Sequence, residues 1–114
     1  MNEIVLEALK GSIRKHENIL SGTESDYGAD NCPLCGLFNR SLMDLKDRCV
    51  GCPVYEKTGE VFCYNTPYQD WILHCDEEHN GYDGDPLNCP ECARLVALEI
   101  EFLKSLNDNY LSTK

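Results

Sequence analysis

Six of the eight cysteines in this 114-residue chain form three Cys-x-x-Cys pairs, and this pattern constrains the fold most strongly. Two intervening residues allow one short turn to present both sulfurs to the same metal ion. The pairs are Cys32 with Cys35, Cys49 with Cys52, and Cys89 with Cys92, while Cys63 and Cys75 lie between the second and third pairs. Eight thiolates are enough for two closed tetrahedral sites, so we expect all eight cysteines to be metal ligands.

The compartment expected from the sequence also favours metal over disulfides. Residues 1–20 alternate charged and apolar residues at helical spacing, unlike a secretory signal peptide. We find no run of about 18 apolar residues, the length that a membrane-spanning helix needs. The sequence therefore predicts a cytoplasmic protein with no membrane contact. Cytoplasmic thiols stay reduced, which favours ligation over disulfides or a redox dithiol.

The spacing suggests how the cysteines divide between two ions. The first two pairs read C-x2-C-x13-C-x2-C over 32–52, close to the usual spacing of a four-cysteine zinc site. The remaining four cysteines, Cys63, Cys75, Cys89 and Cys92, then form a second site. Cys89 and Cys92 open the last helix, as the final ligand pair does in a treble clef, and a helix N-terminus favours thiolate.

Other divisions of the cysteines remain open. A crossed arrangement joins the first and third pairs on one ion and Cys49, Cys52, Cys63 and Cys75 on the other. A single site could use Cys32, Cys35, Cys52 and Cys63. His74 or His79 could replace a cysteine, although the sequence favours a surface or core role for each. His74 adjoins Cys75, and consecutive helical side chains point about 100° apart, so at most one of these two is expected to ligate.

Zinc is the expected metal, as one or two ions. Four cysteines also hold iron–sulfur clusters, which are the main rival. The Cys-Pro-x-Cys form of the first and third pairs favours zinc, as does the lack of a C-x2-C-x2-C run.

Helical signals flank and interrupt the cysteine-rich segment. Residues 2–20 carry an apolar stripe at steps of three and four, and a second such stripe runs through 89–110. Thr66, Pro67 and Gln69 form a capping box that starts a further helix ending near Asn80. We expect one domain, 1–114: a small α-rich zinc-binding fold. Its N- and C-terminal helices pack on a loop-rich metal core, 32–92, with zinc-knuckle and treble-clef-like elements.

The charge limits the class of partner. The formal net charge is −10, and residues 64–101 hold nine acidic residues against one basic residue, Arg94. Zinc modules that bind nucleic acid carry a basic face, so nucleic acid is disfavoured. A local patch of Arg40, Lys46, Arg48 and Lys57 keeps that class as an alternative. The acidity suits solubility or a basic protein partner.

The known catalytic zinc patterns do not fit this chain. HExxH is missing, and the deaminase pattern fails because Glu77 lies one place late and Asn88 stands where proline is needed. Enough cysteines are present to close both sites, whereas a catalytic zinc keeps one position open. The sequence therefore predicts a protein that is not an enzyme. His79-Asn80 leaves a metal-dependent nuclease as a further alternative.

Several of these motifs together resemble a set of small uncharacterised bacteriophage proteins rich in cysteine. The shared features are an N-terminal helix, Cys32-Pro-Leu-Cys35, Cys49-x-Gly-Cys52-Pro-Val, Cys63, and Thr66-Pro67-Tyr68. Those proteins typically finish with a helix similar to 99–106. The resemblance implies a phage protein in the cytoplasm of its host, and it brings no settled activity. Its pattern centres on the cysteines up to Cys63, so segment 64–92 departs from it and leaves one or two metals open.

We therefore expect a non-enzymatic zinc protein that acts through protein contacts. Its size and acidity suit an inhibitor or adaptor of a host protein. Apolar surface left on the terminal helices could support a homodimer.

Overall fold

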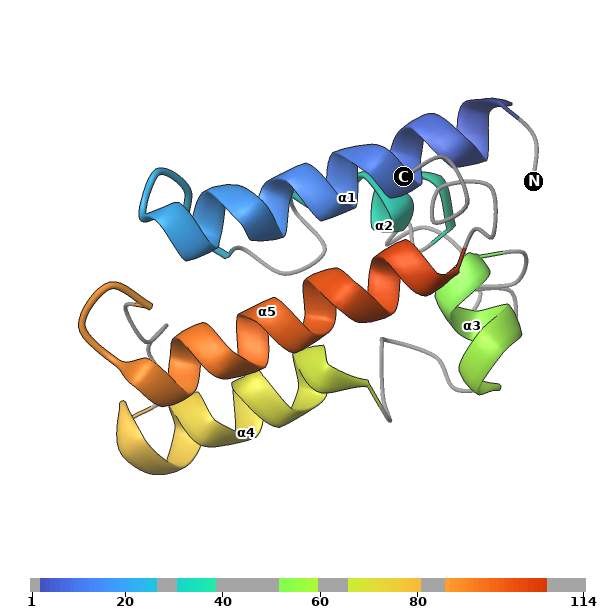
Figure 1. Ribbon diagram of the computed structural model, residues 1–114. Coiled ribbons are helices and arrows are strands. Elements are labelled where there is room, and N and C mark those ends of the chain that lie inside the picture. Colours follow the sequence, from blue (N-terminus) through green and yellow to red (C-terminus); the bar gives the residue numbers. More distant parts are fainter. Residues whose placement is uncertain (1–2, 27–30, 39–51, 60–65, 81–85, 107–114) are drawn as a thin grey trace.

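The computed structural model describes residues 3–26, 31–38, 52–59, 66–80 and 86–106, and these residues form a small, mostly helical protein (Figure 1). Cys49 and Cys63 lie outside the described residues, as does the end of the predicted last helix beyond 106. The helices are α1 (Glu3–Ser21), α2 (Pro33–Phe38), α3 (Pro53–Thr58), α4 (Pro67–Glu78) and α5 (Pro90–Ser105). None of them has the length and apolar content that crossing a bilayer requires.

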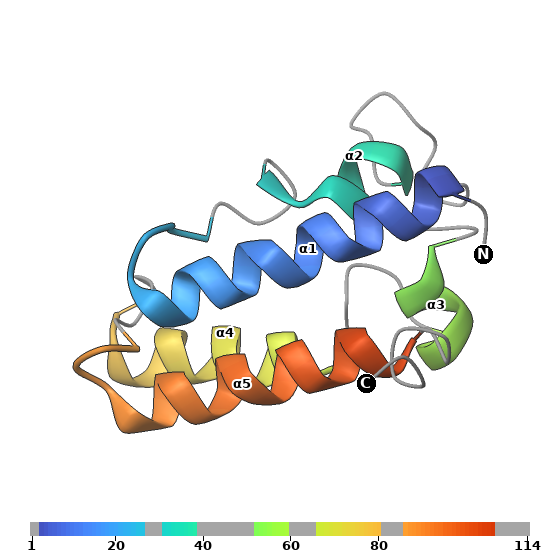
Figure 2. The ribbon, with the colours of Figure 1, turned by 45° about the horizontal axis from the view of Figure 1, so that its top comes forward.

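Three long helices form the body of the described structure. α4 and α5 run antiparallel as a hairpin, and α1 lies along α5, also antiparallel to it (Figures 1 and 2). The C-terminal end of α4, the start of α5 and the C-terminal end of α1 therefore lie at the same end of the described structure. α2 packs on α1, and α3 lies beside the other end of α5. The expected packing of the N-terminal helix against the last helix is thus present.

The hydrophobic core lies between these three helices. Leu9 and Ile13 of α1, Trp71 of α4, and Cys92 and Val96 of α5 are almost completely buried. The spacing of four residues within α1 and within α5 places these side chains on one face of each helix, as in an amphipathic helix. Gly11 lies in the middle of α1, where Pro33 approaches so closely that a Cβ would lie 2.9 Å from Pro33 Cγ. This close approach explains a glycine at a position where it weakens the helix.

Local signals set where α4 and α5 begin. The Thr66 hydroxyl accepts a hydrogen bond from the Gln69 backbone N–H (3.4 Å), and Pro67 occupies the first turn. Cys89 is the N-cap of α5, where its sulfur accepts a hydrogen bond from the Cys92 N–H (3.4 Å) and Pro90 follows. In both cases a side-chain acceptor satisfies a backbone donor that has no partner within the helix.

A buried polar cluster lies between α1 and the hairpin. Lys15 forms an ion pair with Asp26, and the Tyr68 hydroxyl donates a hydrogen bond to Asp26 (2.8 Å). His16 Nδ1 lies 2.9 Å from the Ser12 carbonyl oxygen, and the His16 and Tyr68 rings are nearly perpendicular, with centroids 5.8 Å apart. Burial lowers the pKa of His16 and raises the pKa of Glu99, on α5, to about 8. The cluster therefore brings charged groups into the packing of α1 against α4 and α5.

Candidate metal centre

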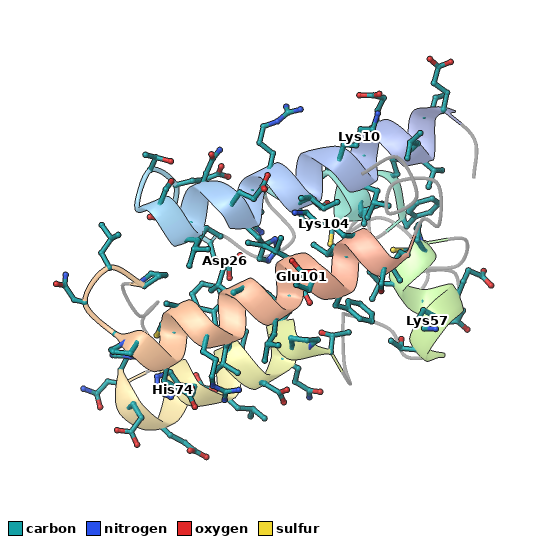
Figure 3. The ribbon with its side chains drawn as sticks, in the orientation of Figure 1. Lys10, Asp26, Lys57, His74, Glu101 and Lys104 are labelled. Atoms are coloured by element: carbon teal, nitrogen blue, oxygen red, sulfur yellow. The ribbon has the colours of Figure 1, made fainter. Side chains whose placement is uncertain are left out.

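Four side chains that could hold a metal ion converge where α4 ends and α5 begins. They are His74, His79, Cys89 and Cys92, and their ligand atoms all lie within 4.8 Å of one another. Figure 3 shows His74 at this end of the hairpin. Among the described residues no other group of three or more histidine, cysteine and acidic side chains comes together in this way.

The end of α4 supplies the two imidazoles. His74 lies in the last part of the helix, and His79 follows its last residue as the C-cap, with its N–H bonded to the Cys75 carbonyl oxygen (2.9 Å). The two ring centroids are 5.1 Å apart and the ring planes are nearly perpendicular. Asn80 then adopts a positive φ of 55°, a conformation that asparagine tolerates better than most residues. The chain thus leaves the helix directly after the second imidazole.

The first turn of α5 supplies the two sulfurs. Cys89 is the N-cap and Cys92 lies three residues later, so both side chains project from the same side of the helix. The Cys92 N–H that bonds to the Cys89 sulfur, together with the helix dipole, favours negative charge at this position. Cys92 is fully buried, whereas the other three side chains are partly exposed.

The nitrogen-to-sulfur distances match a tetrahedral site. His74 Nε2 lies 3.4 Å from Cys89 Sγ, and His79 Nε2 lies 3.4 Å from Cys92 Sγ. Zinc bonds of about 2.3 Å to sulfur and about 2.0–2.1 Å to nitrogen give a tetrahedral N···S edge of about 3.6 Å. The four atoms therefore need to move little to surround one ion.

The two thiols have opposite pKa shifts. The Cys92 N–H, followed by the His74 imidazole, lowers the pKa of Cys89 to about 6. Burial, followed by the hydrogen bond with Cys89, raises the pKa of Cys92 to about 12. At neutral pH and without a cation, the two cysteines therefore carry one negative charge between them, on Cys89. A divalent cation would favour a second thiolate at Cys92, so metal binding at this site would release a proton.

The structure brings together only part of the predicted second site. Cys89 and Cys92 lie in the group, and His74 and His79 lie beside them, although the sequence favoured other roles for both histidines. Cys75 is buried in the hydrophobic core and is not part of the group. This agrees with the expectation that His74 and Cys75 point in different directions. The signal available in the sequence was the pair of histidines at a helix end, before a short loop to Cys-x-x-Cys.

The predicted first site is described only in part. Hydrogen bonds from the Cys35 side chain, together with its backbone N–H, lower the pKa of Cys32 to about 5 against the effect of burial. Cys52 is the buried N-cap of α3, and the described residues do not bring it into a ligand group with Cys32 and Cys35. No disulfide joins two described cysteines. Because Cys49 and Cys63 lie outside the described residues, their ligation stays a prediction.

Three comparisons place the chain against known proteins. No protein-family model matches it, and neither the curated proteins nor the solved structures give a match.

Proposed function

We propose that His74, His79, Cys89 and Cys92 bind one zinc ion that fastens the α4–α5 hairpin, in a protein that acts through contacts with other proteins. The convergence of four nitrogen and sulfur donors within 4.8 Å carries this proposal. A tetrahedral set of two sulfurs and two nitrogens suits zinc better than calcium, magnesium or manganese, which prefer oxygen ligands. The position of Cys89 and Cys92 at a helix start supports a treble-clef-like element as part of this proposal.

A structural role follows from the number of protein ligands. Structural zinc sites are closed by four side chains, whereas catalytic sites keep one position for water or substrate. Here four side chains are available, so no position is left for a substrate. Zinc at this place would join the end of one helix to the start of the next and stabilise the hairpin.

The surface of the hairpin supports a protein partner. Asp70, Asp76, Glu77 and Glu78 of α4 are exposed, and Leu73 and Leu98 expose 51% and 44% of their surface. Arg94, the one basic residue of α5's first half, is paired with Glu91. Such a face would repel the phosphates of nucleic acid and attract a basic protein surface. We therefore favour an inhibitor or adaptor of a host protein over a nucleic-acid-binding module or a nuclease.

Metal content of variants tests the site. Native mass spectrometry of the reduced full chain would count zinc ions in the wild type, His79→Asn and Cys75→Ala. We expect His79→Asn to hold one zinc fewer than the wild type, and Cys75→Ala to hold the same number. Asp76→Asn, on the same exposed end of α4, is the control and should retain all the metal. Loss of zinc from Cys75→Ala with full retention in His79→Asn would overturn the proposed ligand set in favour of the four-cysteine site.

Two further measurements test the mode of action. Cobalt substitution should give the absorption of a four-coordinate site with two thiolates, and a bound water as a ligand would point to catalysis instead. Gel-shift experiments with DNA and RNA at low salt should show no binding. Binding that weakens steeply as salt increases would overturn the proposal in favour of a nucleic-acid module.

A further inference from the structure

We propose that Cys89 and Cys92 form a disulfide on exposure to hydrogen peroxide, and that this modification expels the zinc and opens the α4–α5 hairpin. The inference rests on the proposed zinc site. It assigns the site a second state, in which the same two sulfurs bond to each other instead of to metal.

The geometry of the helix start permits this bond. Cys89 is the N-cap of α5 and Cys92 lies three residues later, in the first turn of the helix. Their sulfurs already lie within 4.8 Å of each other. A disulfide needs Cβ atoms about 3.5–4.5 Å apart, so a small adjustment of the first turn is sufficient.

Because of the composition of the ligand set, one disulfide is enough to release the zinc. Both sulfur ligands belong to the one pair, Cys89 and Cys92, and the other two ligands are imidazoles. A single disulfide therefore removes both anionic ligands and leaves only His74 and His79. A four-cysteine site would keep two thiolates after the same reaction, so sensitivity to oxidation follows from this particular mixture of ligands.

The exposure of the two sulfurs sets the order of the steps. Cys89 is partly exposed and Cys92 is fully buried. Peroxide therefore reaches Cys89, whose thiolate attacks one oxygen, giving a sulfenic acid and releasing hydroxide. The Cys92 thiolate then attacks the Cys89 sulfur, forming the S–S bond and releasing a second hydroxide. Two thiolates lose two electrons in total, and one peroxide is reduced to two hydroxide ions.

Residues 86–88, directly before Cys89, connect the metal site to the end of α1. Leu87 packs against the turn that ends α1, so closely that a Cβ on Gly22 would lie 2.6 Å from Leu87 Cδ1. Gly22 is followed within a few residues by Asp26, which belongs to the buried polar cluster. Release of the metal would therefore loosen both the hairpin and the contact between its loop and α1.

Peroxide treatment of the zinc-loaded full chain tests the inference. The amounts of released zinc are followed with a chromogenic chelator, and peptide mapping by mass spectrometry identifies the disulfide. We expect one zinc released for each Cys89–Cys92 disulfide formed, with recovery of binding after reduction by dithiothreitol. Hydrogen exchange should increase in 86–88 and in the last turn of α1.

A cysteine variant and the zinc content of the reduced chain distinguish a failure of this inference from a failure of the proposed zinc site. Cys75→Ala removes a cysteine outside the ligand set, so the same dose of peroxide should release its zinc with the same Cys89–Cys92 disulfide as in the wild type. Zinc that stays bound in the wild type, or release without a Cys89–Cys92 disulfide, would overturn the inference while leaving the zinc site in place. A reduced wild-type chain that holds no zinc at His79 and Cys89 would overturn the proposed function and this inference together.

Discussion

Lys15 Nζ lies 2.8 Å from Asp26 Oδ1, and their side chains expose only 3% and 4% of their surface. The pair joins α1 to the segment that follows it, and the Tyr68 hydroxyl adds a hydrogen bond from α4 to the same carboxylate. Figure 3 shows Asp26 between α1 and the hairpin. Two charges in this position have lost most of their hydration, so each is stabilised mainly by its attraction to the other.

Removing one partner of this pair should strongly destabilise the fold. Asp26→Asn leaves the Lys15 charge buried without its counterion, and we expect a loss of about 3–5 kcal/mol in the free energy of unfolding. Urea unfolding followed by circular dichroism would measure the loss. Glu7→Gln is the matched control, because the Lys10–Glu7 pair is exposed and 3.7 Å long. Its effect should stay within about 0.5 kcal/mol, and equal effects of the two variants would contradict the prediction.

Glu99 should make stability depend on pH. Burial raises its pKa from 4.5 to about 8 in the folded protein, while the Tyr68 backbone N–H and the Lys15 charge act in the opposite direction. The folded state therefore binds a proton that the unfolded state has already lost. The contribution of this bound proton to the free energy of unfolding is fully present below about pH 4.5, declines as pH rises, and is lost once pH passes about 8.

Glu99→Gln should remove this dependence, because the amide is neutral at every pH. The advantage of the variant over the wild type in free energy of unfolding should grow by up to about 1.4 kcal/mol per pH unit between roughly pH 4.5 and 8. It should then level off. Glu101→Gln, at an exposed position of the same helix, is the control and should follow the wild type. An unchanged difference between Glu99→Gln and the wild type across this range would refute the prediction.

Gly22 should not tolerate a side chain. Its φ is +82°, a region that alanine rarely adopts, and a Cβ would collide with Leu87. We expect Gly22→Ala to lower the free energy of unfolding by about 1 kcal/mol or more. Gly36→Ala is the comparison, because nothing lies within 4 Å of its Cβ position and its φ is not positive. That substitution should be neutral or stabilising by up to about 1 kcal/mol. Thermal unfolding of the two variants side by side provides the measurement.

Chelation of metal should loosen the hairpin. Zinc that binds only the folded chain adds about 4 kcal/mol when its free concentration is 1,000 times the Kd, and a chelator removes this contribution. We expect a lower Tm and a shift in the fluorescence of Trp71, the single and almost fully buried tryptophan. Thermal unfolding with and without EDTA checks this, and an unchanged Tm would show that bound metal does not stabilise the hairpin.

Acid should weaken zinc binding. Protons compete with the metal for the Cys89 thiolate, whose pKa lies at about 6. Lowering the pH from 7 to 5 should therefore raise the Kd for zinc, which competition with a chelator of known affinity would measure. A Kd that stays constant over this range would argue against ligation by Cys89.

The starts of α4 and α5 were predictable because each depends on neighbours in the chain. Thr66, Pro67 and Gln69 form a cap within four residues, and Cys89 with Cys92 forms one turn. The apolar stripes of α1 and α5 likewise predicted two helices with buried faces. In each case the interaction spans one or two helical turns, so the sequence contains all the information required.

The partners of Cys89 and Cys92 were not predictable in the same way. Trp71 and Cys75 are buried in the core, and this orientation of α4 leaves His74 facing the start of α5. The sequence showed that His74 and Cys75 point apart, but not which of them faces the other helix. That choice depends on how the whole apolar face of α4 packs.

By itself, the sequence determined a helical chain with a Cys-x-x-Cys pair at a helix start, because capping and helical periodicity act over a few residues. Only the tertiary structure decided that two histidines join this pair and that Lys15, Asp26 and Glu99 become buried together. Those residues come from separate segments, and the packing of α1, α4 and α5 brings them within reach of one another.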